Sequence, residues 1–477
     1  MEKNIIKKLN QSFQVNSKSE IKNYSKDKEK NALNERKSLK LSKTLYINYI
    51  PAKELSEESI VETEDEQVTD IKIPKNNTIV NNGNTLSRLV TINSIIMHED
   101  CVKNYKVKIP GQDLKDRIEL YEKELFTLMN IEYGKEIIYE DFVLVNNNEN
   151  YYVHLLRTAE LDPNKENFLL IHGFLSSSTH FLSILPYLLL KYNVFIPDTI
   201  GMGLSSRPQV DFDSPEQCEE YFIEIIYILV KKLFFSKKYN IKNNFYIGGH
   251  SLGGFLASHY IVKYPIGIKK VLLLSAAGIT DYHIRGTNIH KEAGRIFGCI
   301  LSFLGCCWAC QPRIQCCYKC ICCHKFIKTF MESYSITIDQ TYIKNNKDGT
   351  PFIVDVNKIN FYLGQLSKLT LDFPDDIYKC MYYIFTLPPP ASINPVELQL
   401  LHQSKLSCIF VYGENDWMDR TGAYRLCQHD RERFKLFIVK NSGHSFAMEN
   451  PKELTNILQI FCEDHSGDQG WSLQGRG

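Results

Sequence analysis

The chain has 477 residues, so an α/β domain of ordinary size would occupy only part of it. Its 56 basic and 55 acidic side chains nearly cancel and leave a net charge of +1. This balance excludes a protein-wide positive field, such as nucleic acid binding requires, as the basis of function.

The first part of the chain is polar and carries its charges in blocks. Residues 1–43 are rich in Lys, Asn and Ser, whereas 53–70, "KELSEESIVETEDEQVTD", is acidic. Few large apolar residues interrupt these tracts, so they cannot bury enough surface to offset the entropy of ordering the chain. We therefore predict that residues 1–112 are mostly disordered. The basic arm is either a solvated tail or a weak contact to an anionic membrane leaflet.

The sequence predicts neither a secretory signal nor a transmembrane helix. The N-terminus, "MEKNIIKKLNQSFQV", has basic residues but no apolar core. The nearest approach to a span, Ile296–Cys310, is uncharged but shorter than the roughly 18 residues that cross a bilayer. Nine of the 15 cysteines fall within Cys299–Cys323. We expect a cytoplasmic, reducing location, where disulfides are disfavoured.

From residue 113 the pattern is that of a folded domain, which we predict to end at 463 before a polar tail, 464–477. "DRIELYEKELFTLMN" has helical spacing, and "IIYEDFVLVNNNENYYVHLLRTAEL" is typical of two strands joined by an Asn-rich turn. Strand-like runs follow, with helical stretches between several of them: Phe168–Ile171, Val194–Pro197, Phe245–Gly248, Val271–Ser275, Cys408–Tyr412 and Phe434–Val439. This alternation predicts a mostly parallel sheet with helices on both faces.

A serine between glycines follows one of these strands. The stretch Gly249–Gly253, "GHSLG", fits the pattern G-x-S-x-G, with an apolar run before it and a helical run after it. A nucleophile elbow requires this strand–turn–helix context, because larger side chains at the flanking positions would collide in so tight a turn. We predict that Ser251 is a nucleophile; the alternative is an ordinary glycine turn.

A serine hydroxyl needs a base to remove its proton, and a late histidine is placed to be that base. His444 lies in "IVKNSGHSFAMENP", just after the last predicted strand. Asp416 follows the preceding strand in "IFVYGENDWMD" and is the predicted orienting acid, with Asp419 in reserve. Ser251, Asp416 and His444 have the chain order expected for this architecture.

Backbone amides for an oxyanion are predicted at another strand end. His172 to Phe174 close the early strand in "FLLIHGFLSSSTHF". There the N–H of Phe174 can join that of Leu252 in holding a tetrahedral oxyanion. His172 itself is interpreted as structural.

These motifs resemble the α/β-hydrolase superfamily over about 135–463. Within it the chain is most similar to the subfamily of lysophospholipases, lysophosphatidic-acid acyltransferases and lipid-droplet lipase coactivators. "YGENDWMD" followed by "GA" at 422–423 is the most telling match, and "LLIHGF", "GMGLSSRP", "GGHSLGGFLASHY" and "NSGHSFAMENP" agree with it. The resemblance implies an α/β-hydrolase fold with an inserted cap, lipid substrates, an acyl–serine intermediate and no cofactor.

Two features bear on the kind of member this chain resembles. Coactivators without hydrolase activity have lost the elbow serine, and Ser251 is present here, which favours an enzyme. The acyltransferase members depend on a His-x-x-x-x-Asp pattern, and here His444 is followed by Glu449 at that place. Glutamate keeps the charge but adds a methylene, which weakens the acyltransferase interpretation without removing it.

Residues 281–395 precede the acid loop, where this architecture inserts a cap. The cysteine-rich run lies here, and three interpretations of it stay open. Cys307, Cys310, Cys317 and Cys320 form two CxxC pairs whose thiolates could bind zinc, although the loop between the pairs is shorter than most zinc modules use. S-acylation beside the uncharged apolar stretch is the second. Packing of small apolar side chains is the third.

The predicted function is hydrolysis of a carboxylic ester. Ser251 attacks an acyl carbonyl that the Phe174 and Leu252 amides activate, while His444 takes its proton and Asp416 holds His444 in place. The apolar cap and the resemblance indicate a fatty acyl group. The predicted partners are a lipid or small ester substrate and, peripherally, a membrane or lipid droplet, without nucleic acid; no pattern indicates an oligomeric state. The alternatives are a lysophosphatidic-acid acyltransferase and a non-catalytic lipid-surface adaptor or lipase coactivator.

Overall fold

The structure, a computed structural model, describes residues 107–145, 148–236, 238–281, 336–372, 380–386, 391–392, 395–402 and 404–463. All of these belong to one unit, Ile95–Gly477. The predictions for residues 1–106, for Cys299–Cys323 and for the tail 464–477 concern parts of the chain outside the described residues.

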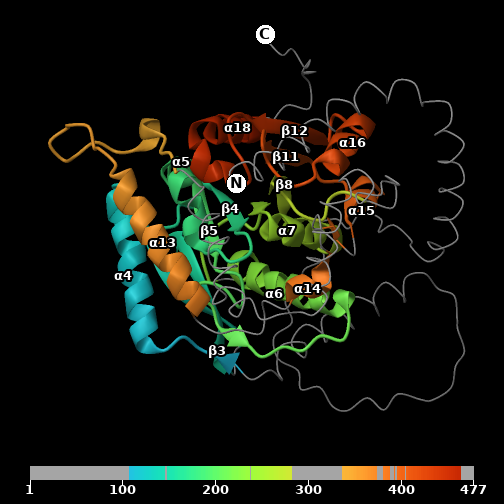
Figure 1. Ribbon diagram of the computed structural model, residues 1–477, viewed down its shortest axis with the longest axis horizontal. Coiled ribbons are helices and arrows are strands. Elements are labelled where there is room, and N and C mark those ends of the chain that lie inside the picture. Colours follow the sequence, from blue (N-terminus) through green and yellow to red (C-terminus); the bar gives the residue numbers. More distant parts are fainter. Residues whose placement is uncertain are drawn as a thin grey trace, which may run out of the picture. The chain divides into compact units, whose positions relative to one another are not determined.

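A large sheet organises this unit (Figure 1). Its strands are β2 (Ile137–Val145), β3 (Asn148–Thr158), β4 (Glu166–Ile171), β5 (Tyr192–Pro197), β7 (Phe245–His250), β8 (Ile268–Leu274), β11 (Cys408–Gly413) and β12 (Phe434–Val439). They lie in the order β12-β11-β8-β7-β4-β5-β3-β2. The strands from β12 to β5 run parallel, and the β2–β3 hairpin joins β5 in an antiparallel orientation. The predicted mostly parallel sheet is confirmed, and every predicted run overlaps one of its strands.

Helices cover both faces of the sheet (Figure 1). α6 (Pro215–Phe234) and α7 (Leu252–Lys263) share one core with it, and α5 (Leu185–Lys191) and α18 (Pro451–Glu463) share the other. The remaining helices and 3-10 turns are α4 (Gln112–Leu128), η1 (Ser178–Ile184), η2 (Gln340–Tyr342), α13 (Val356–Asp372), α14 (Cys380–Ile384), α15 (Glu397–His402), α16 (Thr421–His429) and α17 (Phe446–Glu449). In the part of the chain that the structure describes, no helix combines the length and apolarity that crossing a membrane requires.

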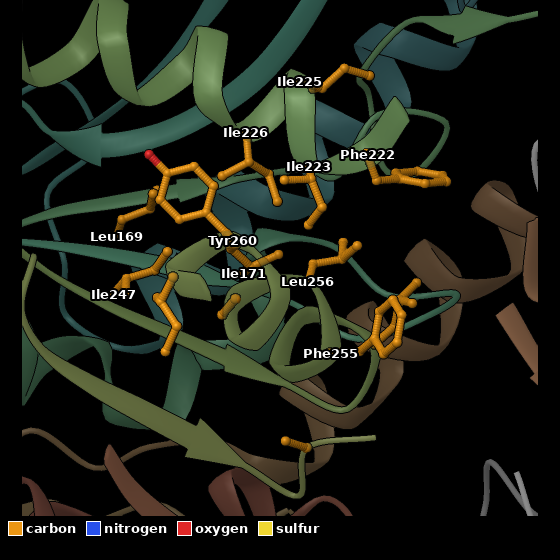
Figure 2. Packing of buried hydrophobic residues seen from close by; sticks show 14 of the residues in the cluster. Leu169, Ile171, Phe222, Ile223, Ile225, Ile226, Ile247, Phe255, Leu256 and Tyr260 are labelled. Atoms are coloured by element: carbon orange, nitrogen blue, oxygen red, sulfur yellow. The ribbon is translucent and has the colours of Figure 1, made fainter. Parts of the chain in front are cut away.

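Strand β4 contributes side chains to the hydrophobic cores on both faces of the sheet. Successive side chains of a strand point to opposite faces, so a strand between two helical layers must be apolar throughout. Leu169 and Ile171 pack among side chains of α6 and α7 (Figure 2), whereas Phe168 and Leu170 pack on the face of α5 and α18. The continuous apolar run therefore has a direct packing cause.

Helix α6 carries the signals that start and end a helix. The side chain of Ser214 accepts a hydrogen bond from the N–H of Gln217 at 3.2 Å, and Pro215 occupies the first helical position. Lys231 and Lys232 lie in the last turn, where the helix dipole favours positive charge. These local signals fix where α6 begins and ends.

The fold begins earlier than the predicted boundary at 112. The short strand β1 (Val107–Lys108) pairs antiparallel with β6 (Arg207–Pro208), and α4 begins at Gln112. The described structure thus begins at residue 107, and the prediction that residues 1–112 are mostly disordered stays a prediction for the rest of that segment. Strand pairing with a segment about 100 residues away leaves no local signal.

Part of the predicted cap region packs at the side of the sheet. α13 lies beside α4 (Figure 1), with the rings of Tyr362 and Tyr121 at 5.5 Å. α14 lies on α6, where the thiol of Cys218 donates to the carbonyl of Cys380 at 3.8 Å. Another short pair, β9 (Phe385–Thr386) and β10 (Ala391–Ser392), follows. A role of 281–395 as a substrate cap stays a prediction.

Helix α4 buries a carboxyl group, which predicts a pH-dependent stability. Glu122 is almost fully buried, and its Oε2 lies 3.9 Å from His154 Nε2 without a hydrogen bond to any described residue. Burial, reinforced by Asp198, holds the pKa of Glu122 well above its ordinary value of 4.5. The native state therefore binds a proton that the unfolded chain releases, and the free energy of unfolding falls as pH rises above 4.5 toward the folded pKa.

We expect Glu122→Gln to remove this fall, because the amide is neutral at every pH. In alkaline buffer, the free energy of unfolding of the variant should exceed that of the wild type by about 1.4 kcal/mol for each unit by which the pKa of Glu122 is raised in the folded state. Denaturant unfolding of both proteins in mildly acidic and mildly alkaline buffers measures it. Glu119→Gln is the control and should keep the wild-type slope, because Glu119 lies about one helical turn earlier with its side chain partly exposed beside Lys123. Equal slopes for wild type and Glu122→Gln would contradict the prediction.

Candidate active site

Ser251 sits on a strained turn between β7 and α7. Its φ is +54°, a conformation that non-glycine residues rarely adopt. The neighbouring strand holds this backbone: the Ser251 N–H donates to Leu274 O at 3.0 Å, and the Ser251 carbonyl accepts from the Ala277 N–H at 3.1 Å. Ser251 is half-buried, whereas the residues on either side of it are buried. The hydroxyl therefore stands at the accessible tip of a rigid turn, as predicted for an elbow.

The glycines on either side of Ser251 have a steric cause. A Cβ added to Gly249 would lie 2.1 Å from Gly253 O, and one added to Gly253 would lie 2.1 Å from Ile171 O. Both are backbone atoms that cannot move aside, so no larger residue fits. The turn is thereby packed against the end of β4.

Asp416 and His444 meet at the ends of the adjacent strands β11 and β12. His444 Nδ1 lies 3.0 Å from Asp416 Oδ1, which also accepts the Met418 N–H at 3.0 Å. Because a carboxylate accepts, Nδ1 carries the proton and Nε2 of His444 is left as the acceptor that a base needs. Burial raises the pKa of Asp416, but His444 and the hydrogen bonds outweigh it, so the pKa lies below its ordinary value.

Asp419, the reserve candidate, is engaged elsewhere. Its Oδ1 accepts the N–H of Thr421 at 2.9 Å and the hydroxyl of the same residue at 2.6 Å, at the start of α16. The structure therefore places Asp416 rather than Asp419 against His444.

The histidine loop is tied to the nucleophile turn through His250. Its Nε2–H donates to the backbone carbonyl of His444 at 2.8 Å, and the two rings lie 4.8 Å apart. Burial, together with the nearby His444 ring, lowers the pKa of His250 to about 3, so the ring is neutral. Among the described residues Ser251 Oγ makes no hydrogen bond; contacts between nucleophile and base are often long before substrate binds.

The two residues predicted to supply oxyanion amides belong to segments next to Ser251. A Cβ added to Gly173 would come within 3.2 Å of Ser251 Cβ, so the turn that carries Phe174 lies against the nucleophile. Leu252 is the first residue of α7, and the first N–H groups of a helix have no partner within it. His172 is structural, as predicted: Nδ1 donates to Gly173 O at 2.8 Å, and Nε2 accepts the Thr199 N–H at 2.9 Å.

Trp417 was not predicted to take part in the site. Its ring lies over the imidazole of His444, with centroids 4.5 Å apart and planes at 44°. A tryptophan face stabilises an adjacent cation, so it favours the imidazolium that forms when His444 takes a proton. The sequence did contain one indication of this role, since Trp417 directly follows the predicted acid Asp416 in "NDWMD".

Comparison with known proteins concerns the fold around Ser251. A family model described as alpha/beta hydrolase fold matches residues 166–292, from β4 through the Ser251 turn and beyond β8. The chain has an α/β-hydrolase fold. The expected fold class is thus confirmed by the family match and by the sheet topology.

Several proteins similar to this chain have names from lipid chemistry. A 1-acylglycerol-3-phosphate O-acyltransferase of Arabidopsis thaliana is 24% identical over 332 residues, covering 68% of this chain and 73% of the relative. Lipase 1 of Psychrobacter immobilis is 33% identical over 114 residues, covering 24% of this chain and 32% of the lipase. Among solved structures, carboxylesterase CesB from Bacillus subtilis is 14% identical, with a TM-score of 0.44 over 73% of this chain and 99% of that one.

Glu449, which takes the place of the aspartate in the acyltransferase pattern, supports the histidine loop. Its carboxylate accepts the backbone N–H of Gly443, the residue before His444. Burial raises the pKa of Glu449, and the hydrogen bond from Gly443 opposes this rise. The contact is to backbone, so it indicates a role in shaping the loop.

We expect Glu449→Ala to lower kcat about tenfold, because it leaves the Gly443 N–H without its acceptor and loosens the loop. Glu449→Gln keeps an acceptor oxygen and should stay near the wild type. Steady-state hydrolysis of a short soluble ester measures both variants. If the Gln variant were as impaired as the Ala variant, the charge itself would be required and Glu449 would act in the chemistry.

The zinc candidates Cys307, Cys310, Cys317 and Cys320 lie outside the described residues. Within the ranges that the structure does describe, no group of three or more His, Cys, Asp or Glu is arranged to hold a metal ion.

Proposed function

We propose that this α/β-hydrolase cleaves a fatty acyl ester through an acyl–serine intermediate, with Ser251 as nucleophile. The observation that carries the proposal is the arrangement at one edge of the sheet. A strained, half-buried serine directly follows His250, which bonds the backbone of His444, and His444 Nδ1 is 3.0 Å from a buried aspartate. Such a set is built to activate a hydroxyl without a cofactor.

The reaction proceeds in two halves. His444 Nε2 takes the Ser251 proton as Oγ attacks the acyl carbonyl, and the N–H groups of Phe174 and Leu252 hold the oxyanion. The tetrahedral intermediate collapses, the alcohol leaves with the proton from His444, and the acyl group stays on Ser251. Water then attacks with His444 as base, and the fatty acid is released.

The names of the relatives support a lipid substrate. They include 1-acylglycerol-3-phosphate O-acyltransferases and lipases, names that refer to acylglycerols and to lipids. Such substrates gather at membranes and lipid droplets, so the proposal includes a peripheral contact with one of these surfaces. S-acylation within Cys299–Cys323 would strengthen that contact, since a buried acyl chain contributes about 0.8 kcal/mol per methylene.

Acyl transfer is the second candidate. The relative with the 332-residue alignment carries the name of an acyltransferase. In that reaction the acyl–serine forms in the same way, and the hydroxyl of a lysophosphatidic acid replaces water in the second half. The two functions differ only in the acceptor.

The test is product analysis with the purified full-length chain. A fluorophosphonate probe first shows whether Ser251 is activated, because an inert hydroxyl does not react. A labelled fatty acyl donor is then supplied with and without lysophosphatidic acid. Labelled fatty acid in both reactions supports hydrolysis; labelled phosphatidic acid in the second supports transfer. If neither product forms and the probe does not label Ser251, the chain is a non-catalytic adaptor and the proposal is wrong.

A further inference from the structure

The turn after β8 contacts both the candidate nucleophile and the candidate acid. Leu274 and Ala277 bond the N–H and the carbonyl of Ser251, at 3.0 and 3.1 Å. Between them, the hydroxyl of Ser275 donates to Asp416 Oδ2, and Ser275 Oγ also approaches His444 O at 3.5 Å. This short segment therefore fixes the nucleophile turn by its backbone and the acid by a side chain.

Ser275 occupies a position at which a serine is costly. Its φ is +44°, in the left-handed region that favours glycine, and its side chain has no exposure to solvent. Its N–H donates to Val411 O at 2.7 Å, which continues the β8–β11 pairing by one residue. Glycine would adopt this positive φ and make the same backbone hydrogen bond without strain. What serine has and glycine lacks at this position is a side-chain hydroxyl.

The hydroxyl completes the coordination of the Asp416 carboxylate. Oδ1 accepts from His444 Nδ1 and from the Met418 N–H, and Oδ2 accepts from Ser275. A carboxylate held at both oxygens cannot rotate about its terminal bond, so Oδ1 stays in line with the imidazole. Without the Ser275 donor, one buried carboxylate oxygen would lose its partner.

We propose that Ser275 is a positioning residue of the active site, whose hydroxyl orients Asp416 and through it His444. This inference rests on the proposed function, because it gives Ser275 a part in the same reaction. Ser275 does not touch substrate or the reacting atoms. Its effect is on kcat and on the pH profile, and KM stays unchanged.

The test compares Ser275→Gly, Ser275→Ala and Ser275→Cys. The Gly and Ala variants both lose the hydroxyl, and we expect each to lower kcat about tenfold on a short soluble ester. The Gly variant also relieves the backbone strain, so its thermal midpoint stays at or above that of the wild type. The Cys variant keeps a weak donor and recovers part of the rate. Ser258→Ala, which removes another fully buried serine hydroxyl, is the matched control and leaves kcat unchanged.

Two further readouts separate positioning from a structural role. A carboxylate that loses a donor is more basic and holds the proton on its imidazole partner more firmly, so the acid limb of kcat/KM moves to higher pH. The titratable groups facing Asp416 include His444, His250 and Glu449, and the variants change none of them. The low-field proton resonance of His444 Nδ1–H, assigned by its loss in His444→Gln, should shift in Ser275→Gly and not in Ser258→Ala.

The outcomes distinguish this inference from the proposed function. Suppose that the wild type hydrolyses the ester and that Ser275→Gly has the same kcat, the same acid limb of kcat/KM and the same His444 resonance. That result would overturn the role of Ser275 and leave the proposed function in place. An inactive wild type would overturn the proposed function, and the resonance would still decide whether Ser275 orients the Asp416–His444 pair.

Discussion

Ser251→Ala is expected to abolish ester hydrolysis by the full-length chain, with a loss of kcat on the order of 10⁶. The substitution removes the only oxygen that can form the acyl intermediate, and the remaining site binds substrate without a nucleophile. The fold should be unaffected: alanine meets the same strain at φ +54° as serine does, and one half-buried oxygen without a hydrogen bond to a described residue contributes less than about 1 kcal/mol. Initial rates on a soluble ester and on a fatty acyl lipid, together with a thermal melt, measure both effects.

The control for this variant lies on the helix that follows the elbow. Ser258→Ala removes a buried hydroxyl that donates to Phe255 O at 2.8 Å, away from His444 and Asp416. It should keep its rate and its labelling by a fluorophosphonate probe, whereas Ser251→Ala should lose both. Substantial hydrolysis by Ser251→Ala would remove the nucleophile assignment and, with it, the proposed mechanism.

The second large effect is expected for Asp416→Asn, with a loss of kcat on the order of 10⁴. An amide in place of the carboxylate can present a donor to His444 Nδ1, which favours the tautomer with the proton on Nε2, where the base must accept. Asp419→Asn should lose far less, because its Oδ1 accepts from Thr421 and the amide oxygen of asparagine can do the same. Rates of both variants on one soluble ester give the comparison.

The two aspartates also differ in how their loss is expected to appear in the pH profile. Asp416 is the partner of His444, so its replacement should change the acid limb of kcat/KM, and the replacement of Asp419 should leave that limb in place. Equal losses for the two variants, or a larger loss for Asp419→Asn, would move the acid assignment to Asp419.

Much of the scaffold was decided by local sequence. Short apolar runs separated by helical periods predict a parallel sheet, because a strand buried on both faces must be apolar throughout and each crossover needs a helix. The glycine at 249 also follows from local geometry, since a Cβ there would lie 2.1 Å from the backbone of Gly253. These features depend on residues close in the chain, where periodicity and turn chemistry carry the information.

The choice between Asp416 and Asp419 needed the tertiary structure. The sequence places both residues in one loop, and only the approach of the His444 loop shows which carboxylate it meets. The same holds for Ser275 and Asp416, which are 141 residues apart, and for His250 and His444, which are 194 apart. Such contacts have no local period or spacing, because they arise when strands from distant parts of the chain are packed side by side. The sequence by itself thus determined the sheet and the candidate reacting groups, and only the packing of strand ends decided which side chains orient them.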